Sequence, residues 1–142
     1  MGTRSLTRVY DGFDPKAKPI VCLYRQYDGY PEGAGKDLAE FLRPFTIVNG
    51  LGRDTAKVAN GMHCLAAQLV AHFKTEPGGF YLYEPDTTDC GEEFEYRIRG
   101  EAGKPIQIEA VEVVGNEKYE LVFKGTPDEF LAFIAKSADA SV

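Results

Sequence analysis

Alternating apolar and polar residues predict most of the strands of this chain. Residues 20–25 are apolar on both faces up to Arg25, a pattern typical of a central strand that is covered on both sides. Residues 5–11 precede this segment, and a turn that contains glycine and proline joins the two, which predicts an antiparallel hairpin. Further strands are predicted at residues 80–84, 93–99, 106–114 and 118–124.

Apolar residues at helical spacing predict three helices. The first covers residues 36–45, where Pro44 limits its extent. After a loop at residues 46–54, the second helix is expected to begin near Thr55 or Asn60 and to run to about Lys74, with Asn60 as a candidate cap. Its core-facing stripe consists of Met62, Leu65, Ala66, Leu69, Val70 and Phe73. The third helix begins with Thr-Pro-Asp-Glu at residues 126–129, the signature of a capping box with proline at the first helical position.

The order of these elements is strand, strand, helix, helix, four strands, helix. Strands and helices do not alternate regularly, so we predict an α+β fold with a largely antiparallel sheet of about six strands and three helices. Within residues 93–99, the apolar side chains should face the core, and Glu95, Arg97 and Arg99 should face outward. A length of 142 residues predicts a single domain with one core.

Composition narrows the classes of partner. The formal net charge of −6 argues against binding to DNA or RNA backbones, which requires a basic face. The sequence has neither an apolar run of membrane-spanning length nor a signal-peptide pattern at its start, so we expect a cytoplasmic protein without a membrane partner. Its three cysteines lack metal-like spacing and are interpreted as reduced thiols.

Candidate catalytic groups are weak. His63 and Cys64 are adjacent, but neighbouring residues on a helix point about 100° apart and do not face each other. The acidic segment at residues 85–93 lacks EF-hand spacing. Phosphate-loop, dinucleotide-binding and serine-hydrolase motifs are absent from the sequence. These observations favour a binding protein over an enzyme, without a metal or a cofactor.

Arginines and aromatic residues remain as candidates for ligand binding. An arginine at the end of a covered strand must meet water, an acid or a ligand, because an unpaired buried charge is costly. Guanidinium groups bind phosphate through paired hydrogen bonds, and aromatic rings stack on bases. One carboxylate of the acidic segment could accept a hydrogen bond from a ribose or a base. The predicted ligand-binding residues are Arg25, Tyr30, Arg53, Asn60, Phe80, Tyr83, Asp89, Arg97 and Arg99.

Four segments together resemble the Thoeris anti-defence one family of phage proteins. They are GTRS at residues 2–5, LYRQYDGYP at 23–31, ANGMHCLAAQL at 59–69 and GGFYLY at 78–83. The resemblance implies a non-catalytic sponge that sequesters a cyclic ADP-ribose isomer made by bacterial TIR-domain enzymes. Some members of that family also take up cyclic oligonucleotides. By this similarity, Arg25 and Arg53 would hold phosphate and Phe80 would stack on adenine.

The resemblance also implies dimers, or assemblies of dimers, with ligand near subunit interfaces, in the cytoplasm of the infected bacterium. Two other functions remain open from the sequence. One is a small phosphodiesterase or ADP-ribose hydrolase that acts through His63 or the acidic segment. The other is an acidic inhibitor that binds a defence protein directly.

Overall fold

A mixed sheet of six strands runs through the part of the chain that the computed structural model describes, residues 2–50, 57–115 and 117–140. The order of strands across the sheet is β5-β2-β1-β6-β7-β8. Strands β1 and β6 are parallel, and the other neighbours are antiparallel. The strands are β1 (Ser5–Asp11), β2 (Val21–Arg25), β5 (Phe80–Tyr83), β6 (Phe94–Gly100), β7 (Gln107–Gly115) and β8 (Lys118–Gly125). The predicted α+β class, with a mostly antiparallel sheet, is therefore confirmed.

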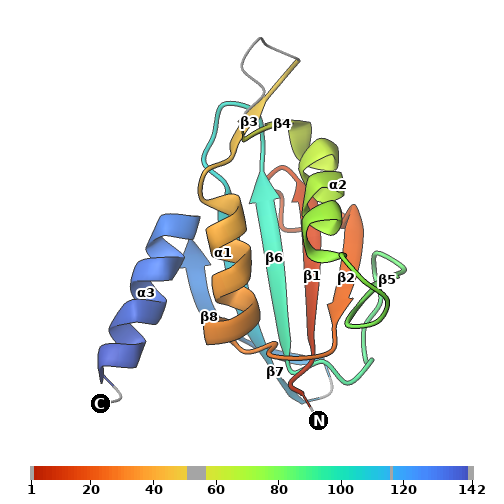
Figure 1. Cartoon of the computed structure of the whole chain (residues 1–142), viewed down its shortest axis with the longest axis vertical. Helices are drawn as coiled ribbons and strands as arrows, with labels where there is room; N and C mark the ends of the chain where they lie inside the picture. The colour runs from red at the N-terminus through yellow and green to blue at the C-terminus, as the bar shows by residue number, and fades with distance from the viewer. Residues whose placement is uncertain (1, 51–56, 116, 141–142) are drawn as a thin grey trace.

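The helices cover one face of this sheet (Figure 1). A π-helical turn, η1 (Pro31–Gly35), leads directly into α1 (Lys36–Leu42). Helix α2 (Gly61–Phe73) lies beside α1, and α3 (Pro127–Ala140) packs against α1 on the side of β7 and β8. None of the helices in the described residues is long and apolar enough to span a membrane.

The hydrophobic core lies between the helices and the sheet. Four residues of the predicted α2 stripe are buried there, namely Met62, Leu65, Ala66 and Leu69. From the sheet, Tyr96 and Ile98 point into the same core and are fully buried, as the alternation in β6 predicts. The capping box of α3 is confirmed, because Thr126 N donates to Glu129 Oε1 at 2.8 Å and Glu129 N donates to Thr126 Oγ1 at 3.2 Å.

The segment before α2 differs from the prediction. Residues 46–48, expected to be loop, and residues 58–60, expected to be helical if the helix began near Thr55, form a small parallel sheet of β3 (Thr46–Val48) and β4 (Val58–Asn60). Helix α2 begins at Gly61, which agrees with the later of the two predicted starts, near Asn60. Asn60 is at the cap position, but its Oδ1 accepts from Gly50 N at 2.8 Å and makes no cap hydrogen bond. Helix α1 ends at Leu42, earlier than residue 45, in keeping with Pro44.

The outward side of β6 is also not solvated as expected. Glu95 and Arg99 are 3% and 5% exposed, because loops fold over the helix-free face of the sheet. One such loop follows β5 and is held by Arg8, whose guanidinium donates to the carbonyls of Pro85 and Thr87. A second loop reaches Arg99, whose Nη1 donates to Asp14 O at 3.1 Å. The charges on this face are therefore partly buried.

Candidate functional site

Arg25 and Phe80 lie directly opposite each other in the antiparallel ladder of β2 and β5. Both side chains are on the helix-covered face of the sheet. The guanidinium carbon of Arg25 is 5.5 Å from the centroid of the Phe80 ring and 4.6 Å from that of Tyr27. The two rings meet edge to face at 5.8 Å. A cation thus lies over two aromatic rings, an arrangement that is favourable by cation–π attraction.

The polar partners of Arg25 are a carbonyl and a carboxylate. Its Nε donates to Tyr27 O at 2.7 Å, and its Nη1 donates to Asp37 Oδ2 at 2.9 Å. The Arg25 side chain is 8% exposed, whereas that of Asp37 is 45% exposed. The charge at the end of β2 therefore meets an acid, one of the three partners that the sequence allowed.

The loop after β2 is fixed by close backbone packing against β1. Gly29 N donates to Thr3 O at 2.9 Å. A Cβ at position 29 would lie 2.8 Å from the carbonyl carbon of Arg4 and 2.9 Å from the Cβ of Ser5, so glycine is required there. From β6, the buried Tyr96 hydroxyl donates to Gly29 O at 2.6 Å, and burial raises the pKa of Tyr96.

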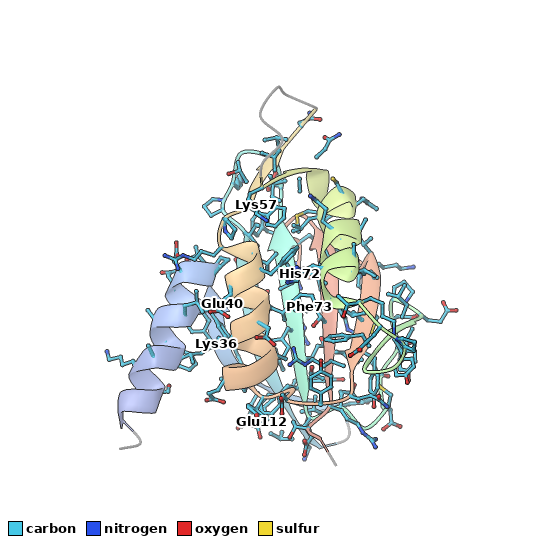
Figure 2. The ribbon with its side chains drawn as sticks, viewed as in Figure 1. Lys36, Glu40, Lys57, His72, Phe73 and Glu112 are labelled. Atoms are coloured by element: carbon cyan, nitrogen blue, oxygen red, sulfur yellow. The ribbon has the colours of Figure 1, made fainter. Side chains whose placement is uncertain are left out.

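The connection from α2 to β5 completes this region. Gly78 and Gly79 both have positive φ, 79° and 77°, which turns the chain from the end of α2 into β5. Gln26 N donates to Gly79 O at 2.9 Å. Phe73, at the end of α2, packs on Phe80 with ring centroids 5.8 Å apart. Figure 2 shows Phe73 and His72 at this end of α2, on the side that faces α1.

Cavities at Arg25 and Phe80 are small. A pocket of about 100 Å³ opens beside Phe80, between Tyr27, Phe73 and residues 75–79. A second hollow, of about 10 Å³, is lined by Arg25 and Thr7 and shares Phe80 with the first. Binding sites for drug-sized ligands usually enclose about 300–1,000 Å³. One chain thus provides a charged and aromatic wall rather than a closed chamber.

A buried hydroxyl lies next to Arg25. Ser5 pairs with Arg25 in the β1–β2 ladder and is fully buried. Its Oγ has no hydrogen-bond partner among the described residues. A buried polar atom without a partner is uncommon and costs stability. We call the group formed by Ser5, Arg25, Tyr27, Asp37 and Phe80 the Arg25 cluster.

Of the other predicted residues that the structure describes, all but one lie apart from the Arg25 cluster. Tyr30 is in the same loop, and its hydroxyl donates to Asp28 Oδ1 at 3.1 Å, a bond that raises the pKa of Tyr30. Asn60 is in β4, at the opposite end of α2 from Phe73 and Phe80. Arg53 lies outside the described residues.

Four predicted residues lie on the helix-free side of the molecule. Tyr83 stacks on Tyr24 with centroids 5.1 Å apart. Arg97 Nε bonds Glu95 Oε2 at 2.6 Å, and Arg99 Nε bonds Glu109 Oε1 at 2.8 Å. These two arginines thus already have carboxylate partners.

Asp89 lines an open groove on the same side of the molecule. The groove, of about 650 Å³, separates residues 88–92 from the β7–β8 turn, and Glu92, Glu117 and Tyr119 also line it. This groove is larger than the pocket at Phe80, but its carboxylates would repel a phosphate. The Arg25 cluster is therefore the better candidate for an anion.

Three members of the Arg25 cluster are absent from the predicted ligand-binding residues. Tyr27 follows Arg25 by two residues, in the same segment as the predicted Tyr30. Asp37 follows the glycine-rich loop in the first turn of α1, and its signal was the need of a covered Arg25 for an acid. Ser5 carried no such signal, because only strand pairing places it beside Arg25.

The enzyme candidates are dispersed in the structure. His63 is exposed on α2, and Cys64 Sγ donates to Gln68 Oε1 at 3.5 Å. His72 stacks on Phe41 with centroids 4.5 Å apart. Among the described residues, no group of three or more His, Cys, Asp or Glu side chains is arranged to hold a metal ion.

Comparisons of the chain with protein-family models, with curated proteins and with solved structures find no match. The function therefore has to be argued from the residues and their geometry.

Proposed function

We propose that this protein binds a small anionic nucleotide signal of the cyclic ADP-ribose type and sequesters it without cleaving it. The observation that carries the proposal is the pairing of Arg25 with Phe80 on adjacent strands. A guanidinium group that can bond phosphate oxygens and a ring that can stack on a base are the two groups that such a ligand requires.

The positions of the resembling segments support this proposal. Residues 2–5, 23–31 and 78–83 are distant in the chain, yet they meet at the Arg25 cluster through Gly29 N to Thr3 O and Gln26 N to Gly79 O. Three of the four segments that resemble the anti-defence family thus share one location. The fourth segment forms β4 and most of α2.

A second copy of the chain would complete the enclosure. The pocket beside Phe80, about 100 Å³, is too small to enclose a nucleotide. On the other face of β5, Tyr81 and Tyr83 are 40% and 39% exposed and offer an aromatic surface for contact between copies. We propose a twofold dimer, or a multiple of dimers, because closed symmetric contacts are the commonest. The assembly would act in the cytoplasm of an infected bacterium.

Binding without cleavage is favoured by the side chains around Arg25. The cluster offers one guanidinium, one carboxylate already bonded to it, a hydroxyl and two rings. His63 and the acidic segment, on which the alternative of a phosphodiesterase or hydrolase depends, are located elsewhere. The proposal therefore assigns no residue to catalysis.

The test is recovery of the ligand. The protein is incubated with the products of a TIR-domain enzyme, separated by gel filtration and heated, and the released small molecules are identified by mass spectrometry. We expect an intact cyclic ADP-ribose isomer from the wild type and much less from Arg25→Lys. Arg43→Lys is the matched control, because Arg43 is 63% exposed and pairs with Asp128 at the surface.

Two results would overturn the proposal. Release of a cleaved product would favour the enzyme alternative. Recovery of no nucleotide, together with retention of a host defence protein in a pull-down, would favour the protein inhibitor.

A further inference from the structure

The Arg25–Asp37 pair is unequal in its exposure to solvent. Arg25 is 8% exposed and Asp37 is 45% exposed, with Nη1 and Oδ2 2.9 Å apart. The arginine is also held by Tyr27 O at 2.7 Å and lies over two rings. The carboxylate belongs to the first turn of α1 and has solvent on one side. If the pair separates, Asp37 is therefore the member that moves.

We propose that Asp37 is an internal competitor that occupies the place at Arg25 taken by a phosphate group of the ligand. The inference rests on the proposed function and specifies which ligand group the site accepts. On binding, phosphate oxygens replace Asp37 Oδ2 at Nη1, and the half-exposed carboxylate turns to water, which hydrates it at low cost. Buried Arg25 keeps a counter-charge at every stage, as the cost of an unpaired buried charge requires.

This arrangement sets a threshold for ligands. A lone carboxylate that replaces Asp37 exchanges one similar bond for another and gains little. A pyrophosphate brings two adjacent negative charges and several acceptor oxygens, so its bonds to the guanidinium fork exceed those of Asp37. Because Asp37 must be displaced by any anion, it weakens all of them by the same factor. Only ligands that bond the guanidinium strongly, such as those with a pyrophosphate, then stay bound at low concentration.

The test measures affinity for inorganic pyrophosphate and for malonate by calorimetry. The variants are Asp37→Asn, which keeps the shape of the side chain, and Asp37→Ser, which suits the first turn of a helix. Asp128→Asn is the control, because Asp128 also pairs with an arginine, at 2.7 Å, but is 71% exposed and far less buried than the Arg25 pair. Asp37→Asn and Asp128→Asn change the net charge equally, so a general charge effect cancels between them.

We expect both Asp37 variants to bind pyrophosphate about three- to tenfold more tightly than the wild type. The ligand no longer has to break a partly exposed ion pair, and no carboxylate at position 37 repels it. Asp128→Asn should bind like the wild type. Malonate should gain affinity by a similar factor in the Asp37 variants, because Asp37 competes with every anion for Arg25 alike. Melting curves establish that each variant is folded.

Three results would overturn the inference. They are unchanged or weaker pyrophosphate binding by folded Asp37 variants, the same gain in Asp128→Asn, and binding by neither the wild type nor the variants at millimolar pyrophosphate. The probe does not depend on the nucleotide signal. If the Asp37 variants bind pyrophosphate more tightly but the wild type retains no nucleotide, the proposed function is wrong and the role of Asp37 stands. If the nucleotide is retained and the gain is absent, only the role of Asp37 fails.

Discussion

Arg8 on β1 and Glu95 on β6 form a buried ion pair across the parallel strands at the centre of the sheet. Their Nε and Oε1 atoms are 3.3 Å apart, and the side chains are 4% and 5% exposed. The same arginine bonds two carbonyls of the loop after β5. One side chain thus joins the middle of the sheet to a loop that covers its helix-free face.

Replacement of Arg8 with alanine should lower the free energy of unfolding by about 3 kcal/mol, because it leaves a buried carboxylate short of a partner. This loss of stability is at the lower end of the range for a broken buried ion pair, because Arg97 still bonds Glu95 at 2.6 Å. Urea denaturation measures it. The double variant Arg8→Met with Glu95→Leu should recover most of the stability. An Arg8→Ala protein as stable as the wild type would show that the pair contributes nothing.

At the Arg25 cluster, Arg25→Lys should weaken nucleotide binding about tenfold, because an ammonium group keeps the charge but loses the planar fork. Titration calorimetry with the recovered nucleotide measures the affinity. Normal affinity in a folded Arg25→Lys protein would place the ligand elsewhere.

Phe80 requires separate measurements of stability and binding, because it is 8% exposed and packs on Phe73. Phe80→Ala should lower the free energy of unfolding by roughly 3–5 kcal/mol. Phe80→Leu keeps more of the packing but loses the ring, so it should weaken binding by about 1–3 kcal/mol if the ring stacks on a base. Phe80→Tyr should bind almost normally. If a Phe80→Leu protein binds with full affinity, Phe80 contributes to the core and not to ligand binding.

Alkaline pH should destabilise the protein partly through Cys22. Burial raises the pKa of this thiol from 9.0 to about 11. Below pH 9 the thiol is protonated in both states and contributes no pH dependence. Between about pH 9 and pH 11 the unfolded chain releases its proton first, so stability falls as the pH rises, by up to roughly 2–3 kcal/mol.

Cys22→Ala isolates this contribution. The difference in unfolding free energy between the wild type and the variant should narrow as the pH rises through that window, while the raised tyrosine pKa values affect both proteins alike. Urea denaturation at a series of pH values provides the measurement. Parallel stability curves for the two proteins would contradict the prediction.

The N-terminus of α3 offers a local test. Thr126→Ala removes the hydroxyl that caps Glu129 N, and it should lower the free energy of unfolding by about 1 kcal/mol. Thr126→Ser should be nearly neutral, since a serine hydroxyl can make the same bond. Thermal melting of the two variants is sufficient. Equal melting temperatures for alanine and serine would mean that the cap does not stabilise the helix.

Local patterns predicted the elements whose side chains repeat often enough to define a face. The α2 stripe and the alternation of Tyr96 and Ile98 place these residues in the core, as the structure confirms. Strands β3 and β4 were not predicted, because three residues in each strand are too few to show an alternating pattern.

Contacts between segments that are distant in the sequence could not be predicted from local patterns. Alternation assigned Glu95 and Arg99 to one side of β6, but it could not show that loops from residues 12–18 and 84–92 would bury them. Likewise, the position of Arg25 called for water, an acid or a ligand without identifying Asp37. The cross-strand meeting of Arg25 and Phe80 depends on the pairing of β2 with β5, which the pattern of either segment alone does not specify.

The parallel β1–β6 pair also affects how the chain can fold. Ser5 pairs with Phe94, so the middle of the sheet joins segments roughly ninety residues apart, and contacts this distant in sequence slow folding. The hairpin of β1 and β2 can form early, from the first residues made. Until β6 leaves the ribosome, however, the other edge of β1 has no neighbour and is open to strands of other chains.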